Sequence, residues 1–288
     1  MATVAPLIVI TGPTASGKSA LALELAERYN GEIICADSRT VYEGMDIGTA
    51  KPSEQDQKRV RHHLLDVITP DQRFTAADFQ TLAREAIADI RARGKTPFVV
   101  GGTGLYIDGL ILDYKFGDEA DAELRKKREK MSSEELVLEL KKQHIEVPHN
   151  HDNKRHLIRA LEQGVINRNR EGSPQNGVFV VAIATEKAVL YERISRRADE
   201  IFDLGVVNET EALMAKYGPQ FESMSGNIYP IAGQLIEGSL TVEGAKELSI
   251  IKDRQLAKRQ ITWLKRHDFV KWLSIDEARM YISELLDE

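Results

Sequence analysis

The fold of this chain is decided by Leu7-Ile8-Val9-Ile10-Thr11-Gly12-Pro13-Thr14-Ala15-Ser16-Gly17-Lys18-Ser19. The first five residues are apolar or β-branched and predict a buried strand. The last eight spell G-x-x-x-x-G-K-S, the phosphate-binding loop of nucleotide-binding, often ATP-binding, proteins. Its glycines turn backbone N–H groups toward a phosphate and its lysine adds a positive charge, at the start of a helix expected over Ala20–Tyr29. We therefore predict that a di- or triphosphate binds here, with Ser19 as a Mg²⁺ ligand, on the residues Gly12, Pro13, Thr14, Ala15, Ser16, Gly17, Lys18 and Ser19.

The composition is that of a folded protein outside membranes. Apolar residues make up 42% of the 288 residues, enough for a full hydrophobic core, and Met1–Pro6 lacks the charged start of a secretory signal. Since no apolar run approaches the ~20 residues that span a bilayer, we expect a cytoplasmic protein without membrane contact. The single cysteine, Cys35, excludes a disulfide framework and a cysteine-rich zinc site, and we expect it in the core.

Short strand patterns alternate with helical patterns along the chain. We expect strands at Leu7–Thr11, Glu32–Ala36, Thr96–Val100 and Val178–Thr185, and a short one near Val270–Leu273. Most of them are followed by an amphipathic helix, which predicts a parallel sheet. The expected fold is α/β, a P-loop NTPase-like parallel sheet flanked by helices.

The strand signal disappears in the middle of the chain. Residues 116–176 are polar and rich in charge, with a helix expected around Ala122–Gln143. We therefore expect a P-loop α/β catalytic core with C-terminal helices in residues 1–115 and 177–288, interrupted by a mostly helical insertion at 116–176.

Polar residues follow two further predicted strands. Asp37 ends the second strand, and Thr103 lies in the Gly101-Gly102-Thr103-Gly104 turn after the third. Because parallel strands present their carboxyl ends at one edge of a sheet, we expect both residues near the phosphate-binding loop. Asp37 could hold Mg²⁺ through water, or it could accept a proton from an incoming nucleophile, and the residues alone leave both readings open.

Basic residues are concentrated in two segments of a chain whose net charge is −6. Residues 154–170 hold five Lys and Arg against one acid, and residues 252–267 hold six against one. In the second segment, helical spacing puts Ala257 and Ile261 on one face and Gln255 and Arg259 on the opposite face. A basic outer face with amide side chains suits contact with RNA phosphates and base edges, although such a face can also be merely solvated.

In their order along the chain, six motifs resemble those of the bacterial tRNA dimethylallyltransferases, the IPP transferase family. The resemblance covers nearly the whole sequence and is strongest in residues 7–112 and 253–264. The motifs are Gly12–Ser19, Asp37–Tyr42, Gly44–Pro52, His62–Asp66, Gly101–Tyr106 and Ala257–Trp263.

The resemblance implies the transfer of a dimethylallyl group from dimethylallyl diphosphate to N6 of the adenosine 3′-adjacent to the tRNA anticodon, with Mg²⁺. Lys18, and Ser19 through the metal, would then stabilise the departing diphosphate. Asp37 would act as the general base. The hydroxyls of Thr14 and Thr103 would orient the diphosphate or the amine.

Two arginines four residues apart share one helix face, Arg193 and Arg197. The resemblance points to Arg197 as the contact to the leaving group, with Arg193 as the alternative. A solvated basic face paired with Glu192 and Glu200 would leave neither arginine near the diphosphate.

The resemblance also implies contacts to the tRNA anticodon stem-loop. In two places this chain departs from the family pattern: His156 shifts the register of the basic helix around Arg155 and Arg159, and Ile228-Tyr229-Pro230 replaces a Gly-Tyr-basic sequence. The residues implied to contact tRNA are Asp37, Ser38, Arg39, Thr40, Thr103, Arg155, Arg159, Arg254, Gln255, Lys258, Arg259 and Gln260.

Three other functions share part of this pattern. An adenylate isopentenyltransferase would use the same loop and Asp37 on a free nucleotide, without a basic RNA surface. A P-loop small-molecule kinase would bind ATP in the loop and transfer a phosphoryl group. A non-catalytic RNA-binding module would have no use for polar residues at three strand ends. We expect the partners to be dimethylallyl diphosphate and tRNA, and the protein to be a monomer.

Overall fold

The computed structural model describes residues 5–116, 121–149, 151–163, 172–219 and 222–287. They belong to two compact units, one within Met1–Ile111 and Pro174–Glu288 and the other within Leu112–Ser173. The insertion expected at residues 116–176 lies close to the bounds of the second unit.

The first unit contains one sheet of six parallel strands in the order β3-β2-β4-β1-β5-β6. At the end of β1, Thr11 pairs with Gly101 of β4 and with Ala182 of β5. The loops that follow these strands therefore begin side by side, and the expected parallel sheet flanked by helices is confirmed. The strands are β1 (Leu7–Thr11), β2 (Gly31–Cys35), β3 (His62–His63), β4 (Thr96–Gly101), β5 (Val178–Ile183) and β6 (Lys271–Leu273).

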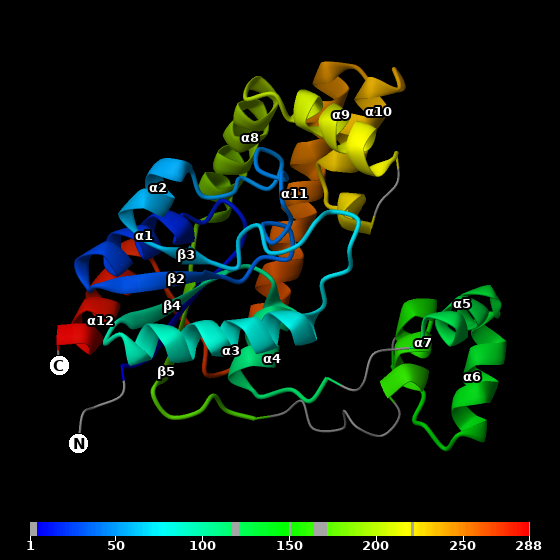
Figure 1. Cartoon of the computed structure of the whole chain (residues 1–288), viewed down its shortest axis with the longest axis horizontal. Helices are drawn as coiled ribbons and strands as arrows, with labels where there is room; N and C mark the ends of the chain where they lie inside the picture. Colours follow the sequence, from blue (N-terminus) through cyan, green and yellow to red (C-terminus); the bar gives the residue numbers. More distant parts are fainter. Residues whose placement is uncertain (1–4, 117–120, 150, 164–171, 220–221, 288) are drawn as a thin grey trace. The chain divides into compact units, whose positions relative to one another are not determined.

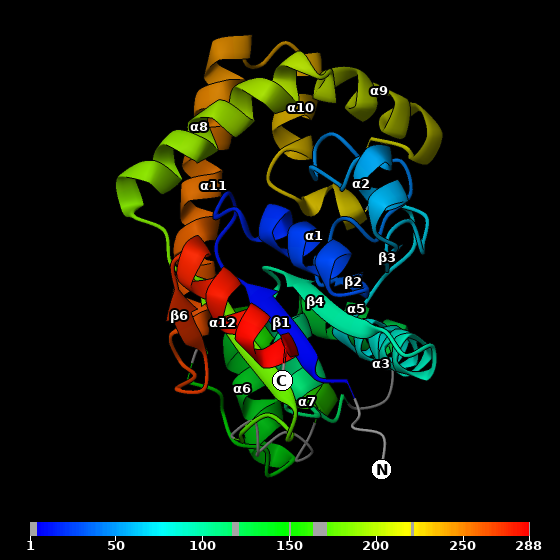
Figure 2. The same ribbon diagram turned by 90° about the vertical axis from the view of Figure 1, so that its left-hand side faces the viewer.

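Helices cover both faces of this sheet (Figures 1 and 2). Helices α1 and α12 pack against one face, and α3 lies against the other with α4 beside it. The helices of this unit are α1 (Lys18–Arg28), α2 (Glu54–Arg59), α3 (Ala76–Ala92), α4 (Gly104–Ile111), α8 (Lys187–Asp203), α9 (Val206–Tyr217), α10 (Tyr229–Ile236), α11 (Val242–Leu264) and α12 (Ile275–Asp287), with a short 3₁₀ helix, η1, at Glu222–Ser225.

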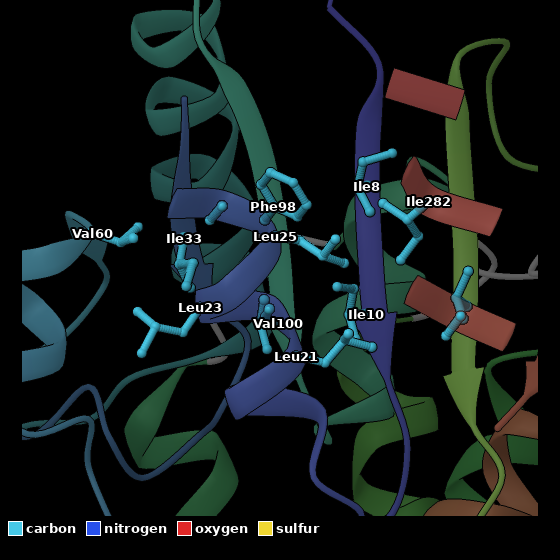
Figure 3. Close-up of a cluster of buried hydrophobic side chains, with 14 of the residues drawn as sticks. Ile8, Ile10, Leu21, Leu23, Leu25, Ile33, Val60, Phe98, Val100 and Ile282 are labelled. Atoms are coloured by element: carbon cyan, nitrogen blue, oxygen red, sulfur yellow. The ribbon is translucent and has the colours of Figure 1, made fainter. Parts of the chain in front are cut away.

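The core between the sheet and α1 follows from strand alternation. Successive side chains of a strand point to opposite faces, so Ile8 and Ile10 lie on the same side of β1. There they pack with Leu21 and Leu25 of α1, and Ile282 of α12 joins the same cluster (Figure 3). Cys35 is buried in this cluster, as expected.

The insertion has a small core of its own. Leu136, Leu140, Leu157 and Leu161 are buried against one another from α6 and α7. The single helix expected over Ala122–Gln143 is wrong because Ser132 caps a new helix, accepting a hydrogen bond from the Glu135 N–H. The helices of this unit are α5 (Ala122–Lys130), α6 (Ser133–Lys142) and α7 (Lys154–Gln163).

One strand and several boundaries also differ from the sequence expectation. Strand β3 was not expected, because two residues are too few to show an alternating pattern. Helix α1 begins at Lys18, before the expected Ala20, directly after Gly17 in the left-handed conformation. Strand β5 ends at Ile183 rather than Thr185. Among the described residues, no helix is long and apolar enough to cross a membrane.

Candidate active site at the carboxyl ends of the strands

A cavity of about 910 Å³ opens where β1, β2 and β4 end. Its walls come from the phosphate-binding loop, the loops after β2 and β4, and helices α8 and α11. The structure thus brings together residues that are far apart in the sequence. The predicted site residues that line it are Thr14, Lys18, Ser19, Asp37, Ser38, Arg39, Thr40, Thr103, Arg197, Arg259 and Gln260.

The phosphate-binding loop has the backbone form that its glycines predict. The φ angles of Gly12, Ala15 and Gly17 are 141°, 61° and 91°, in the region that favours glycine. A Cβ on Gly12 would lie 3.1 Å from the Ser16 Oγ and 3.2 Å from the Ile183 N. The Ser16 hydroxyl is buried without a hydrogen-bond partner among the described residues. The loop therefore forms a tight turn at the N-terminus of α1, where an anion is favoured.

Lys18 lies in a positively charged part of the cavity. Its ammonium donates a 3.3 Å hydrogen bond to the Pro13 carbonyl. Burial and, to a smaller extent, the positive charge of Arg197 lower the pKa of Lys18, the carboxylate of Asp37 opposes them, and the resulting pKa is about 8. A bound anion would restore the charged form of the lysine, so this arrangement favours an anionic ligand.

Arg197 and Arg193 have different places although they share a helix. Arg197 lines the cavity and donates from Nη1 to the Thr14 hydroxyl at 2.9 Å and from Nη2 to the Thr49 carbonyl at 3.4 Å. Its Nε is buried without a hydrogen-bond partner among the described residues. Arg193 instead donates to the Ser16 carbonyl at 3.1 Å and does not line the cavity. Of the two arginines, Arg197 is thus the one placed to reach a ligand.

Asp37 and Thr103 belong to two loops that touch. The Asp37 Oδ1 accepts a 2.8 Å hydrogen bond from the Arg39 N–H, which orients the carboxylate. The Thr103 hydroxyl accepts from the Ser38 N–H at 3.1 Å, a contact that leaves its hydrogen able to donate to a ligand. A Cβ on Gly101 would lie 2.0 Å from the Ala36 carbonyl oxygen, so only glycine allows this approach.

Two neighbours of Asp37 are engaged inside the protein. The Arg39 guanidinium donates to the Ser223 carbonyl at 3.1 Å and to the Ser225 hydroxyl at 3.2 Å, and so holds η1 against the loop after β2. Thr40 is 6% exposed, and its hydroxyl is buried without a hydrogen-bond partner among the described residues. The tRNA contacts expected of both residues remain predictions.

One wall of the cavity is held by Glu209, a residue that the sequence analysis did not single out. The Glu209 carboxylate of α9 accepts hydrogen bonds from the N–H groups of Asp46, Ile47 and Gly48 at 2.7 to 3.0 Å. The Tyr229 hydroxyl donates to the same carboxylate at 2.8 Å. Burial and the Glu209 charge raise the pKa of Tyr229, so the phenol stays a neutral donor. No local pattern marks Glu209, because the three backbone N–H groups that it accepts from are more than 160 residues away.

The chain's departure at Ile228-Tyr229-Pro230 builds part of this wall. Ile228 and Tyr229 are buried at the start of α10, and Pro230 lies in its first turn, where a missing N–H costs little. A Cβ on Gly48 would lie 2.6 Å from the Tyr229 ring. Of the two glycines in the Gly44–Pro52 motif, Gly48 is therefore required by this packing.

Helix α11 has the amphipathic character expected from its sequence. Ala257 is buried, whereas Gln255, Lys258 and Arg259 are exposed. Arg254 is only partly exposed, and its guanidinium lies 4.6 Å from the centre of the Tyr191 ring. The outer face of α11, by which we mean Gln255, Lys258, Arg259 and Thr262, is exposed to solvent.

Gln260 differs from the exposed Lys258 and Arg259 because both ends of its amide bind within the protein. Its Oε1 accepts from the Thr14 N–H at 2.8 Å, and its Nε2 donates to the Gly102 carbonyl at 3.1 Å. The amide that was expected on tRNA is thus used within the protein.

The other expected tRNA contacts lie in the insertion, on α7. Arg155 is exposed and Arg159 is partly buried. The rest of this basic segment, residues 164–170, lies outside the described residues.

The donor atoms in the cavity fit a magnesium ion bound together with a phosphate ligand. Among the described residues there is no cluster of three His, Cys, Asp or Glu side chains that could hold a metal alone. Mg²⁺ is usually held by one or two protein oxygens, by phosphate oxygens and by water. The Ser19 hydroxyl and the Asp37 carboxylate line the same cavity and offer this type of donor.

Comparisons with known proteins agree on one family. The family model described as IPP transferase matches residues 40–267. A protein named tRNA dimethylallyltransferase from Desulforudis audaxviator is 39% identical over 95% of this chain and 93% of its own length. One from Pelotomaculum thermopropionicum is 38% identical over 94% of this chain and 91% of its own.

A solved structure extends this likeness to the fold. The tRNA isopentenylpyrophosphate transferase of Bacillus halodurans superposes with a TM-score of 0.75 at 35% identity, over 98% of this chain and 97% of that protein. A eukaryotic dimethylallyltransferase acting on tRNA shares the fold, with a TM-score of 0.77 at 24% identity over 94% of this chain and 74% of its own.

Proposed function

This chain belongs to the IPP transferase family, and we propose that it transfers a dimethylallyl group from dimethylallyl diphosphate to N6 of the adenosine 3′-adjacent to the anticodon of tRNA, releasing diphosphate. The observation that carries the proposal is the shared cavity. The phosphate-binding loop, Asp37 and Thr103 all open into it. A leaving group and an attacking amine could therefore meet there.

The diphosphate would lie on the phosphate-binding loop. Loop N–H groups, the Lys18 ammonium and the Arg197 guanidinium would face the charge that grows as the allylic C–O bond breaks. Arg197 is already oriented by the Thr14 hydroxyl, so it needs little rearrangement. Bound Mg²⁺, held by the Ser19 hydroxyl and by diphosphate oxygens, would neutralise part of the same charge.

The amine would approach from the side of Asp37 and Thr103. As the C–O bond breaks, a bond forms between N6 of the adenine and the allylic carbon, and the proton that N6 loses passes to the Asp37 carboxylate. The Arg39 N–H holds that carboxylate in place, and the Thr103 hydroxyl has a hydrogen free to orient the base. An allylic carbon tolerates positive charge, so positioning and leaving-group stabilisation should supply most of the rate.

The RNA would be held by exposed basic side chains. Lys258 and Arg259 of α11 are exposed, and Arg259 also lines the cavity. Arg155 of α7 is exposed in the insertion. Exposed cations of this kind contact RNA phosphates. We propose that the anticodon stem-loop is their partner and that the protein acts as a monomer in the cytoplasm.

One assay tests the proposal against its rivals. Purified protein and Mg²⁺ are mixed with dimethylallyl diphosphate and either tRNA or AMP, and the digested nucleosides are analysed by mass spectrometry. We expect dimethylallyl adenosine from tRNA and none from AMP. Product from AMP alone would favour the adenylate enzyme, and ATP consumption without prenyl transfer would favour a kinase.

A further inference from the structure

Gln260 of α11 joins two loops of the cavity that are not neighbours in the sequence. Its amide oxygen accepts from the Thr14 N–H at 2.8 Å, and its amide nitrogen donates to the Gly102 carbonyl at 3.1 Å. One side chain thus bonds both to the phosphate-binding loop after β1 and to the turn after β4, Gly101–Gly104, which we call the glycine loop. Both ends of the amide are used inside the protein.

The glycine loop is shaped to receive this amide. A Cβ on Gly102 would lie 2.3 Å from the Gln260 Nε2, a distance that real Cβ atoms do not show. At Gly104 a Cβ would lie 2.3 Å from the Trp263 Cδ1, on the same helix as Gln260. The Trp263 indole N–H donates to the buried Asp108 carboxylate at 2.8 Å, which fixes this part of α11. The loop therefore packs against α11 at two points.

The two joined loops carry opposite sides of the proposed reaction. The phosphate-binding loop holds Lys18 and the Thr14 hydroxyl that orients Arg197. The glycine loop holds Thr103, which is tied to the loop of Asp37 through the Ser38 N–H. Because an in-line displacement is sensitive to misplacement of about 1 Å, the spacing of these loops should affect the rate strongly.

We propose that Gln260 is a positioning residue that sets the spacing between the loop that holds the diphosphate and the loop that faces the incoming amine. It acts through Thr14 and Gly102 rather than by contacting tRNA. This inference rests on the proposed function and gives a role inside the protein to a side chain for which the family resemblance implied a tRNA contact.

Two substitutions test the contact from its two sides. Gln260→Ala removes the bridge, and Gly102→Ala pushes a methyl group against it. For each variant we expect a 10- to 100-fold lower single-turnover transfer rate at saturating substrates, with a tRNA dissociation constant within twofold of wild type. Gln234→Ala, which replaces an exposed helical glutamine outside the cavity, is the matched control and should leave both quantities unchanged.

The double variant separates direct contact from general damage. In the Gln260→Ala background the methyl group of Ala at position 102 no longer meets an amide, so we expect a rate no lower than that of the slower single variant. Fully multiplicative losses would overturn the proposal. A tenfold weaker tRNA affinity with an unchanged rate at saturation would also overturn it and would return Gln260 to RNA recognition. If Gln260→Ala does not fold, the rate and the tRNA affinity of Gly102→Ala decide by the same criteria.

A binding measurement keeps this test distinct from the proposed function. Calorimetry with inorganic diphosphate and Mg²⁺ should show several-fold weaker binding to Gln260→Ala than to wild type, because the phosphate-binding loop loses the side chain that fixes its position at Thr14. Absence of prenyl transfer by the wild type would defeat the proposed function and leave this readout standing. Equal diphosphate affinity of Gln260→Ala and wild type would contradict the positioning role of Gln260 and would leave the proposed function untouched.

Discussion

Two sets of polar side chains differ in how they are held: those on the floor of the cavity, by which we mean Asp37, Thr103 and Arg197, and those on the outer face of α11. On the floor, the Asp37 carboxylate, the Thr103 hydroxyl and the Arg197 guanidinium each have a hydrogen-bond partner within the protein at 2.8 to 3.1 Å. On the outer face, Lys258 and Arg259 are exposed to solvent. Groups that take part in chemistry gain from being held before the substrate arrives, whereas cations that meet RNA phosphates can be ordered on binding. We therefore expect substitutions on the floor to change the rate, and substitutions on the outer face to change tRNA affinity.

The largest effect should come from Asp37→Asn. The amide cannot accept the N6 proton, so we expect the single-turnover transfer rate to fall by roughly 10³-fold. The amide oxygen of the new asparagine can still accept the hydrogen bond from the Arg39 N–H, so diphosphate affinity should stay within about twofold of wild type. Rapid-quench assays and calorimetry measure the two quantities. An active Asp37→Asn protein would remove Asp37 as the base.

Lys18 should affect both diphosphate binding and transfer. We expect Lys18→Ala to lower the transfer rate by roughly 10²-fold and to weaken diphosphate binding, because a cation in a partly desolvated site is lost. The comparison with Asp37→Asn is informative because only Lys18→Ala should weaken binding. Equal diphosphate affinity of Lys18→Ala and wild type would contradict this role.

The pH dependence of diphosphate binding should report the same lysine. The pKa of Lys18 is lowered to about 8, so its side chain is positively charged at lower pH and loses this charge as the pH rises through 8. Above pH 8 we expect affinity for dimethylallyl diphosphate to fall toward a limit of about tenfold per pH unit. Lys18→Arg, which stays charged over this range, provides the control and should show no such fall.

A smaller effect, on stability, is expected at Tyr229, whose hydroxyl donates to Glu209 behind the cavity wall. Tyr229→Phe removes the hydrogen bond to Glu209, and we expect the free energy of unfolding to fall by about 1 kcal/mol. Because Tyr229 is 1% exposed, tRNA affinity should not change. Denaturant unfolding and a tRNA titration test both statements. A large loss of tRNA affinity with normal stability would mean that this residue belongs with the RNA surface.

The smallest effect should come from Arg259→Ala on the outer face of α11. We expect a two- to fivefold higher dissociation constant for tRNA. The plot of the logarithm of the binding constant against the logarithm of the salt concentration should have a slope that is shallower by about 0.7 to 1. Arg196→Ala is the matched control, since Arg196 is an exposed arginine of α8 whose Nε lies 3.5 Å from Glu200. An unchanged salt slope in Arg259→Ala would identify the outer face of α11 as merely solvated.

Local patterns in the sequence were sufficient for the elements that carry the chemistry. The strand and glycine turn at residues 7–19 predicted β1, the phosphate-binding loop and α1, because the backbone form of this loop depends on adjacent residues. Because Asp37 and Thr103 follow predicted parallel strands, they were expected at the same edge of the sheet, and both line the cavity there. Of the two arginines, Arg197 lines the cavity and Arg193 does not, while a contact of Arg197 with a ligand stays a prediction.

Long-range contacts account for what the sequence reasoning missed. Glu209 looks like any exposed acid of an amphipathic helix, yet it accepts three consecutive backbone N–H groups of a distant loop. The family resemblance implied a tRNA contact for Gln260, and its hydrogen bond with the Thr14 N–H, 246 residues away, could not be read from local sequence. A helical wheel gives the direction of a side chain around the helix axis but does not show which neighbour lies there.

By itself, the sequence determined the class of fold, the position of the glycine-rich loop after β1 and the amphipathic character of α11, since each depends on residue types at short spacing. Tertiary structure alone decided which polar groups meet: Arg197 with Thr14, Glu209 with the loop at Gly48, and Gln260 between two strand-end loops. The physical reason is that hydrogen bonds depend on distances and angles between atoms, and those between distant residues exist only after the chain has folded.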